Sequence, residues 1–100
     1  MYLWVDDVRS CPSDIYEHAK SVQQAEIMIA RREEMGDPYE LLDLDHDAGD
    51  YVKKGGDYIK LLDWLEATKK NYPIRIHSMN PVGVQNMRAI IQKNNWIEVR

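Results

Sequence analysis

Short apolar runs alternate with longer amphipathic stretches along this chain of 100 residues. The short runs have the length and the β-branched or aromatic content of strands, and each is followed by turn-forming or polar residues. The pattern therefore predicts five strands, at Tyr2–Val5, Ile15–Ala19, Glu40–Leu44, Ile74–Ile76 and Trp96–Val99.

The stretches between the later strands have helical spacing. Ser21 and Gln24 form a capping-box pattern at the start of the first helix, the second occupies Asp57–Lys70, and Asn80 as N-cap precedes Pro81 at the start of the third. Each helix carries one apolar stripe for a core, formed by Val22, Ala25, Met28 and Ile29, by Ile59, Leu62 and Leu65, and by Val84, Met87, Ile90 and Ile91.

Three helices that each lie between two strands predict an α/β fold with a mostly parallel, five-stranded sheet and right-handed crossovers. The length supports a single domain that spans residues 1–100. No apolar run reaches the roughly 18 residues of a membrane span, and no signal peptide opens the chain. The lone Cys11 cannot form an internal disulfide, so we expect a whole, cytosolic protein.

The formal net charge of −4 disfavours binding to duplex nucleic acid, which needs several cations on one face. A small anionic ligand needs only a few local donors and stays compatible with this charge. We therefore expect neither a duplex nor a membrane partner, while the tryptophan and tyrosine content permits a homodimer.

Polar side chains concentrate where three of the predicted strands end. Ligands of parallel sheets bind at this carboxyl edge, so the concentration predicts a binding site. The side chains are Asp6, Asp7 and Arg9 after the first strand, Asp45, His46 and Asp47 after the third, and His77, Ser78 and Asn80 after the fourth.

Each of these groups also has a purely structural interpretation. Asp6 and Asp7 are typical of a turn, a single histidine is often a structural residue, and Asn80 serves as a helix cap. The cap and a ligand site are compatible, because the N–H groups of the first helical turn point toward any anion placed there. Gly83 in that turn would let a ligand approach the backbone closely.

The segment Asp47–Asp57 contains Gly49, Gly55 and Gly56 together with Lys53 and Lys54, without a P-loop pattern. It fits a lid whose lysines meet phosphate, and it fits a solvated loop, which is the simpler interpretation.

The acids after the first and third strands resemble those of response-regulator receiver domains, where such acids hold Mg²⁺. Asp6 and Asp7 with either Asp43 or Asp45 match these positions, and Ser78 matches the hydroxyl residue after the fourth strand. The receiver lysine after the fifth strand is missing, and the first crossover is truncated, without a helix.

The fuller resemblance is to the cyclic-phosphate processing receiver-like domain family. Its hallmarks resemble Leu3–Arg9, Leu44–Asp47 (Leu-Asp-His-Asp), Gly55-Gly56 before a helix and His77–Pro81 (His-Ser-Met-Asn-Pro). The resemblance covers nearly the whole chain. It implies a three-layer, receiver-like (flavodoxin-like) sheet and the handling of nucleotides with cyclic phosphates in bacterial and phage conflict systems.

On this resemblance we expect binding and hydrolysis of a cyclic-phosphate nucleotide. Imidazoles titrate near neutral pH, so His46 and His77 suit the acid–base pair. Hard carboxylate oxygens of Asp6, Asp7 and Asp45 suit Mg²⁺ or Mn²⁺. The remaining expected ligand contacts are Arg9, Asp47, Ser78, Asn80 and Gly83.

Two rival functions use the same sequence features. The domain could sequester a cyclic nucleotide without cleaving it, since the same donors would serve. It could also be a degenerate receiver that acts only through protein contacts.

Overall fold

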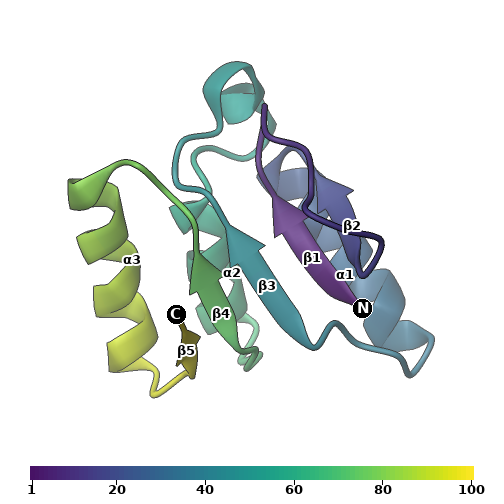
Figure 1. Cartoon of the computed structure of the whole chain (residues 1–100). Coiled ribbons are helices and arrows are strands. Elements are labelled where there is room, and N and C mark those ends of the chain that lie inside the picture. The colour runs from purple at the N-terminus through teal and green to yellow at the C-terminus, as the bar shows by residue number, and fades with distance from the viewer.

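The computed structural model describes all residues, 1–100, and has an α/β fold (Figure 1). Its elements follow one another in the expected order, strand, strand, and then helix and strand three times, with one short 3₁₀ helix, η1, before the second α-helix. They are β1 (Tyr2–Val5), β2 (Tyr16–Ala19), α1 (Val22–Glu34), β3 (Leu41–Leu44), η1 (Gly49–Lys54), α2 (Ile59–Ala67), β4 (Ile74–Ile76), α3 (Pro81–Lys93) and β5 (Glu98–Val99).

All five strands are parallel, in the order β2-β1-β3-β4-β5. The register places Val5 opposite Leu44, and Leu44 opposite Ile76, so β1, β3 and β4 end at the same level. The residues that follow these strand ends are consequently brought together at one edge. The predicted α/β fold with a five-stranded parallel sheet is confirmed.

The helices cover one face of the sheet. Leu3, Val5, Leu42 and Leu44 point toward that face and share one buried cluster with apolar residues of α1, α2 and α3. Figure 1 shows α1 and α2 behind the sheet, and α3 packs on α2. Since side chains alternate along a strand, the residues between them point to the opposite face.

That opposite face has no helix. The connection from β1 to β2, residues 6–15, crosses it as an irregular segment (Figure 1), and the chain ends soon after β5. The truncated first crossover is therefore present as expected. The fold differs from the expected three-layer arrangement in having two layers, because the short connection has too few residues to form a covering helix.

The helix starts follow the sequence signals closely. The Ser21 hydroxyl accepts a hydrogen bond from the Gln24 N–H (3.0 Å), and the Asn80 side chain accepts one from the Gly83 N–H (3.0 Å). The Gln24 side chain reaches back to the N–H of Lys20 instead of that of Ser21. β1 and β4 have the predicted bounds, β2 and β3 each begin one residue later, and β5 and α2 are shorter than expected. No helix combines the length and apolar character that spanning a membrane requires.

Candidate functional site

Three strand ends supply the centre of the site. The N–H groups of Asp45 and His77 continue the sheet ladder, donating to the carbonyls of Val5 (2.9 Å) and Leu44 (2.8 Å). Asp6 likewise donates to the carbonyl of the last residue of β2 (3.2 Å). The backbone of the sheet thereby fixes Asp6, Asp45 and His77 side by side at the carboxyl edge.

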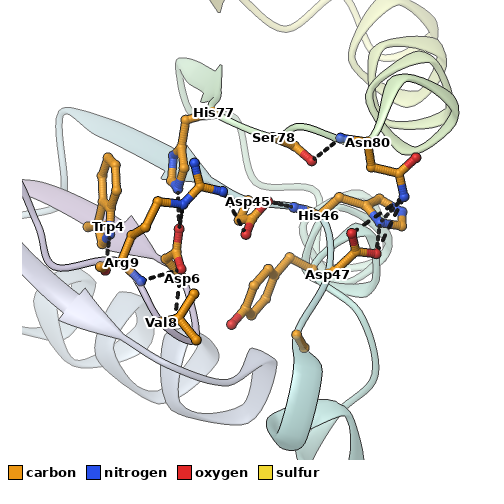
Figure 2. Close-up of polar contacts among 12 residues, drawn as sticks. Trp4, Asp6, Val8, Arg9, Asp45, His46, Asp47, His77, Ser78 and Asn80 are labelled. Atoms are coloured by element: carbon orange, nitrogen blue, oxygen red, sulfur yellow. Dashed lines mark hydrogen bonds and ion pairs between the residues drawn. The ribbon is translucent and has the colours of Figure 1, made fainter.

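Asp6 is fully buried, and both its carboxylate oxygens are engaged (Figure 2). Oδ1 accepts from the N–H groups of Val8 and Arg9, each at 2.9 Å. Oδ2 lies 2.9 Å from Nε2 of His77 and 3.2 Å from Nε of Arg9. Burial alone would raise the pKa of Asp6, but the hydrogen bonds from Arg9, Val8 and His77 outweigh it, so the pKa lies below its ordinary value.

His77 lies between two carboxylates. Its Nδ1 is 2.6 Å from Oδ1 of Asp43 and its Nε2 is 2.9 Å from Oδ2 of Asp6. An ionised carboxylate only accepts hydrogen bonds, so a ring with N–H groups on both nitrogens satisfies both partners. The ring also stacks on Trp4, with centroids 3.7 Å apart and planes 3° from parallel. His77 is therefore held on three sides.

Asp43 is a site residue whose role the sequence left undecided. It lies on the helix-free side of β3, where it also accepts a hydrogen bond from the hydroxyl of Tyr16 (3.1 Å). Burial and this hydrogen bond raise the pKa of Tyr16. Asp43 thus orients His77, while Asp45 belongs to the acidic cluster. An acid between two buried leucines is the signal that marks such a position, and Trp4 and Tyr16 had no comparable signal.

The acidic cluster consists of Asp6, Asp7 and Asp45, each with one oxygen within 4.8 Å of the others. Three hard oxygen donors at this spacing fit a divalent cation such as Mg²⁺. The Arg9 guanidinium also bridges the cluster, with Nη2 3.3 Å from Oδ2 of Asp45 and Nε near Asp6. Three carboxylates at this spacing attract positive charge, and Arg9 supplies part of it.

His46 lies in a second group, at the start of α3. Its Nδ1 is 2.9 Å from Oδ1 of Asp47 and 3.5 Å from Nδ2 of Asn80. The shorter contact favours one tautomer: a neutral ring that donates Nδ1–H to Asp47 has Nε2 as its acceptor, and Nε2 has no hydrogen-bond partner in the protein. Asn80 also reaches Asp47, at 3.4 Å. Asp57 completes a further trio of metal-ligand type with His46 and Asp47.

Gly83 lies against the His46 ring. A Cβ atom at this position would lie 2.5 Å from Cγ of that ring. The close approach that the glycine permits is therefore made by a side chain of this protein, and the Gly83 N–H is already bonded to the Asn80 cap. Ser78 accepts from the N–H of Asn80 (3.1 Å) and so shapes the turn before α3.

The two histidines lie at the same edge but in different groups. Figure 2 shows the His77 ring beside Asp6 and Arg9 and the His46 ring beside Asn80 and Asp47, with Asp45 between them. They share no hydrogen-bond partner. The link between the groups is Asp45, whose Oδ1 accepts from the N–H of His46 (2.8 Å) and whose Oδ2 contacts Arg9.

A search of curated proteins gives no match to this sequence. The family model described as "Cyclic-phosphate processing Receiver domain" matches residues 1–93. This match covers all three α-helices and the first four strands, including the three whose ends supply the polar edge. The chain therefore belongs to the cyclic-phosphate processing receiver domain family.

Proposed function

We propose that this domain binds a nucleotide that contains a cyclic phosphate at the carboxyl edge of its sheet and hydrolyses the cyclic ester. The observation that carries the proposal is the ordered edge itself. Arg9, the acidic cluster and His77 form one connected network, and His46 beside it keeps one ring nitrogen free. Membership of a family that handles cyclic phosphates supports the same substrate class.

The reaction adds one water across a phosphorus–oxygen bond. His46 is the proposed base: Asp47 holds Nδ1–H, so Nε2 accepts a proton as the water oxygen attacks phosphorus. His77 is the proposed acid: a ring with N–H groups on both nitrogens, facing Asp43 and Asp6, would give one proton to the oxygen that leaves phosphorus. The product is a phosphomonoester, or an opened diester, with one free hydroxyl.

The phosphoryl oxygens need positive or hydrogen-bonding partners. Arg9 is about half exposed and offers guanidinium N–H groups beyond those that contact Asp6 and Asp45. Ser78 and Asn80 lie at the opposite side of the edge, where the hydroxyl and the amide N–H groups can turn toward the same anion. We assign these three side chains to phosphate binding.

The acidic cluster would repel a phosphate without a counter-charge. Asp6, Asp7 and Asp45 would hold Mg²⁺ or Mn²⁺, and the bound ion would neutralise charge on the phosphoryl oxygens. The chain's own contribution is to hold the three carboxylates close together and to favour the ionised form of Asp6. Hydrogen bonds from Val8 and Arg9 achieve this for Asp6.

The test is incubation with 2′,3′- and 3′,5′-cyclic nucleotides and cyclic oligonucleotides, with and without Mg²⁺ or Mn²⁺, followed by product analysis. We expect one of these classes to be opened, and His46→Ala and His77→Ala each to lower the rate by roughly 10²–10⁴-fold. His18→Gln is the matched control, since His18 contacts only the backbone carbonyl of Asp6 (2.7 Å) and glutamine keeps a donor.

Three other results of these experiments would assign the domain a different function or remove the histidines from the reaction. Recovery of intact ligand from a tight complex would make the domain a sequestering module. Cleavage at an unchanged rate by both alanine variants would remove the histidines from the chemistry. If no nucleotide or cation shifts the melting temperature, the domain acts through protein contacts instead.

A further inference from the structure

Only some of the lysine and arginine side chains of this protein form ion pairs. Seven of the thirteen lysine and arginine side chains form ion pairs with carboxylates. Of the six that form none, four lie within or directly before the chain segments of α1 and η1, in a protein whose net charge is −4. These four are Lys20, Arg31, Lys53 and Lys54.

A groove runs along α1 beside η1 and is lined by two of these cations, Arg31 and Lys54. Its volume is about 450 Å³, which is within the usual range of small-ligand sites. None of its lining residues is acidic. Tyr51, half-buried against the core, contributes an aromatic ring to the lining, and Gln23 and Gln24 contribute amides.

The η1 segment, which supplies Tyr51 and Lys54 to the groove, begins next to Asp7 of the acidic cluster. Gly49, the first residue of η1, lies so close to Asp7 that an added Cβ would be 2.3 Å from its carboxylate. At the other end of η1, Gly55 packs against Val22 in the first turn of α1, where an added Cβ would be 2.8 Å from the Val22 side chain. The η1 segment thus connects Asp7 with the helix that forms the groove.

A second link joins the groove to the strand ends. Asp6 donates its N–H to the carbonyl of Ala19, two residues before Ser21, which lines the groove. The next carbonyl, of Lys20, accepts a hydrogen bond from the buried hydroxyl of Tyr58 (2.7 Å). The positive groove and the proposed reaction edge are consequently held together by hydrogen bonds of the fold.

We infer that this groove is a second subsite of the same ligand, and that it binds a further phosphate with its attached nucleoside. The inference rests on the proposed function and narrows its substrate to nucleotides with at least two phosphates. Arg31 and Lys54 would contact the second phosphate, and the Tyr51 ring would stack on a base. A mononucleotide with one cyclic phosphate would fill the edge and leave the groove unused.

Two ligands share this chemistry: a linear oligonucleotide that ends in a cyclic phosphate, and a cyclic dinucleotide. The experiment therefore compares four probes by calorimetric titration. They are a 2′,3′-cyclic mononucleotide, a 5′-phosphorylated dinucleotide ending in a 2′,3′-cyclic phosphate, a cyclic dinucleotide, and a linear 5′-phosphorylated dinucleotide without any cyclic phosphate.

The variants are Arg31→Glu/Lys54→Glu and Tyr51→Ala, with Lys69→Glu as the matched control. Lys69 is likewise exposed and unpaired, but it follows α2, at the end of the sheet remote from the site. We expect the wild-type protein to prefer one of the two larger cyclic-phosphate probes over the mononucleotide, and the double variant to lose roughly tenfold of that preference. The double variant should bind the mononucleotide as the wild-type protein does, and Lys69→Glu should bind all four probes with wild-type affinity.

An unchanged preference in the double variant and in Tyr51→Ala would overturn the groove as a subsite. The linear probe separates this result from a failure of the proposed function. If no cyclic phosphate is bound or cleaved while the linear dinucleotide still binds in a manner that depends on Arg31 and Lys54, the subsite stands and the cyclic-phosphate assignment fails.

Discussion

Asp6 connects more of the site than any other side chain. Its Oδ1 caps the turn after β1 through the N–H groups of Val8 and Arg9, while its Oδ2 meets the Arg9 guanidinium and the His77 ring. These partners favour the ionised carboxylate, which explains why the pKa of Asp6 lies below its ordinary value in spite of burial. The charge of Asp6 is thus part of the folded state.

We predict that Asp6→Asn lowers the free energy of unfolding by about 2–3 kcal/mol at neutral pH, because charged hydrogen bonds are lost in a buried place. The sign of the pH dependence follows from linkage. A folded-state pKa below the unfolded value of about 3.9 stabilises the fold above that pH, and the contribution is lost as the pH falls through the folded pKa. The difference between wild type and variant should therefore shrink below about pH 4.

Urea unfolding at several pH values between 7 and 3 measures this difference. Asp63→Asn is the control, since Asp63 is half exposed and faces only Lys60 at 3.9 Å. Its effect should stay within about 0.5 kcal/mol at all pH values. A gap between wild type and Asp6→Asn that does not change with pH would contradict the role assigned to the charge.

At the scale of elements, the N-terminus of α3 is fitted to the His46 ring. Replacing glycine by alanine inside a helix ordinarily stabilises it by about 1 kcal/mol. At Gly83 the added Cβ would lie 2.5–2.8 Å from ring atoms of His46, so the ring or the helix must move. We predict that Gly83→Ala instead destabilises the fold by about 1–3 kcal/mol.

The measurement is thermal unfolding together with the NMR chemical shifts of the His46 ring, which should move in Gly83→Ala. Gln85→Ala, at an exposed position of the same helix, should leave both nearly unchanged. A more stable Gly83→Ala protein with unaltered His46 resonances would show that this contact does not position the ring.

The η1 helix is anchored by its first glycine, which contacts the acidic cluster. Gly49 has φ of +54° and would direct a Cβ into the Asp7 carboxylate. Gly36 has a similar φ of +72° but no atom within 4 Å of an added Cβ. Alanine substitutions at Gly36 and Gly49 therefore separate two losses of stability: that of a left-handed backbone with a side chain, and that of displacing Asp7.

We predict that Gly36→Ala costs about 1 kcal/mol, from the backbone alone, and that Gly49→Ala costs clearly more because Asp7 must also shift. Chemical denaturation of both variants gives the two values. Equal losses would mean that Asp7 adapts freely and that η1 does not fix its position.

The elements could be predicted from sequence because each is defined by local signals. The Ser21 and Asn80 caps and the period of the apolar residues place the helices, and a parallel sheet then brings the polar strand ends together. What remained undecided depends on contacts distant in sequence. Asp43 alternates with Leu42 and Leu44 and so lies on the helix-free face of β3, whereas Asp45 follows the end of the strand. Only the packed sheet shows that the His77 ring lies beside Asp43.

The separation of His46 from His77 could not be predicted for a related reason. Both follow strand ends, so the sequence places them at one edge, but it does not specify the direction of each ring. His46 is directed toward α3 by Asp47 and Asn80, while His77 is directed toward the helix-free face by Trp4 and Asp43. The short η1 helix likewise lacks the periodicity that marks longer helices.

At the scale of the whole molecule, the charged side chains are unevenly distributed, although the net charge is only −4. The acidic cluster lies at the carboxyl edge, and four of the six unpaired cations lie within or directly before α1 and η1. The absence of a helix on one face leaves the Trp4–His77–Asp43 arrangement under a single irregular connection. The domain therefore concentrates its buried charge at one end instead of distributing it.

Such a concentration predicts that a divalent cation stabilises the fold. Mg²⁺ at ten times its dissociation constant would add about 1.4 kcal/mol, which in a domain of this size raises the melting temperature by roughly 5–10 °C. Sodium chloride of equal ionic strength should not reproduce the shift in melting temperature, and a chelator should reverse it.

Two groups of side chains could hold the ion, and one variant in each distinguishes them. Asp7→Asn, in the acidic cluster, should abolish the shift in melting temperature. Asp57→Asn, in the trio with His46 and Asp47, should preserve it. The reverse pattern would move the cation to the trio that contains His46, the residue proposed to act as the base.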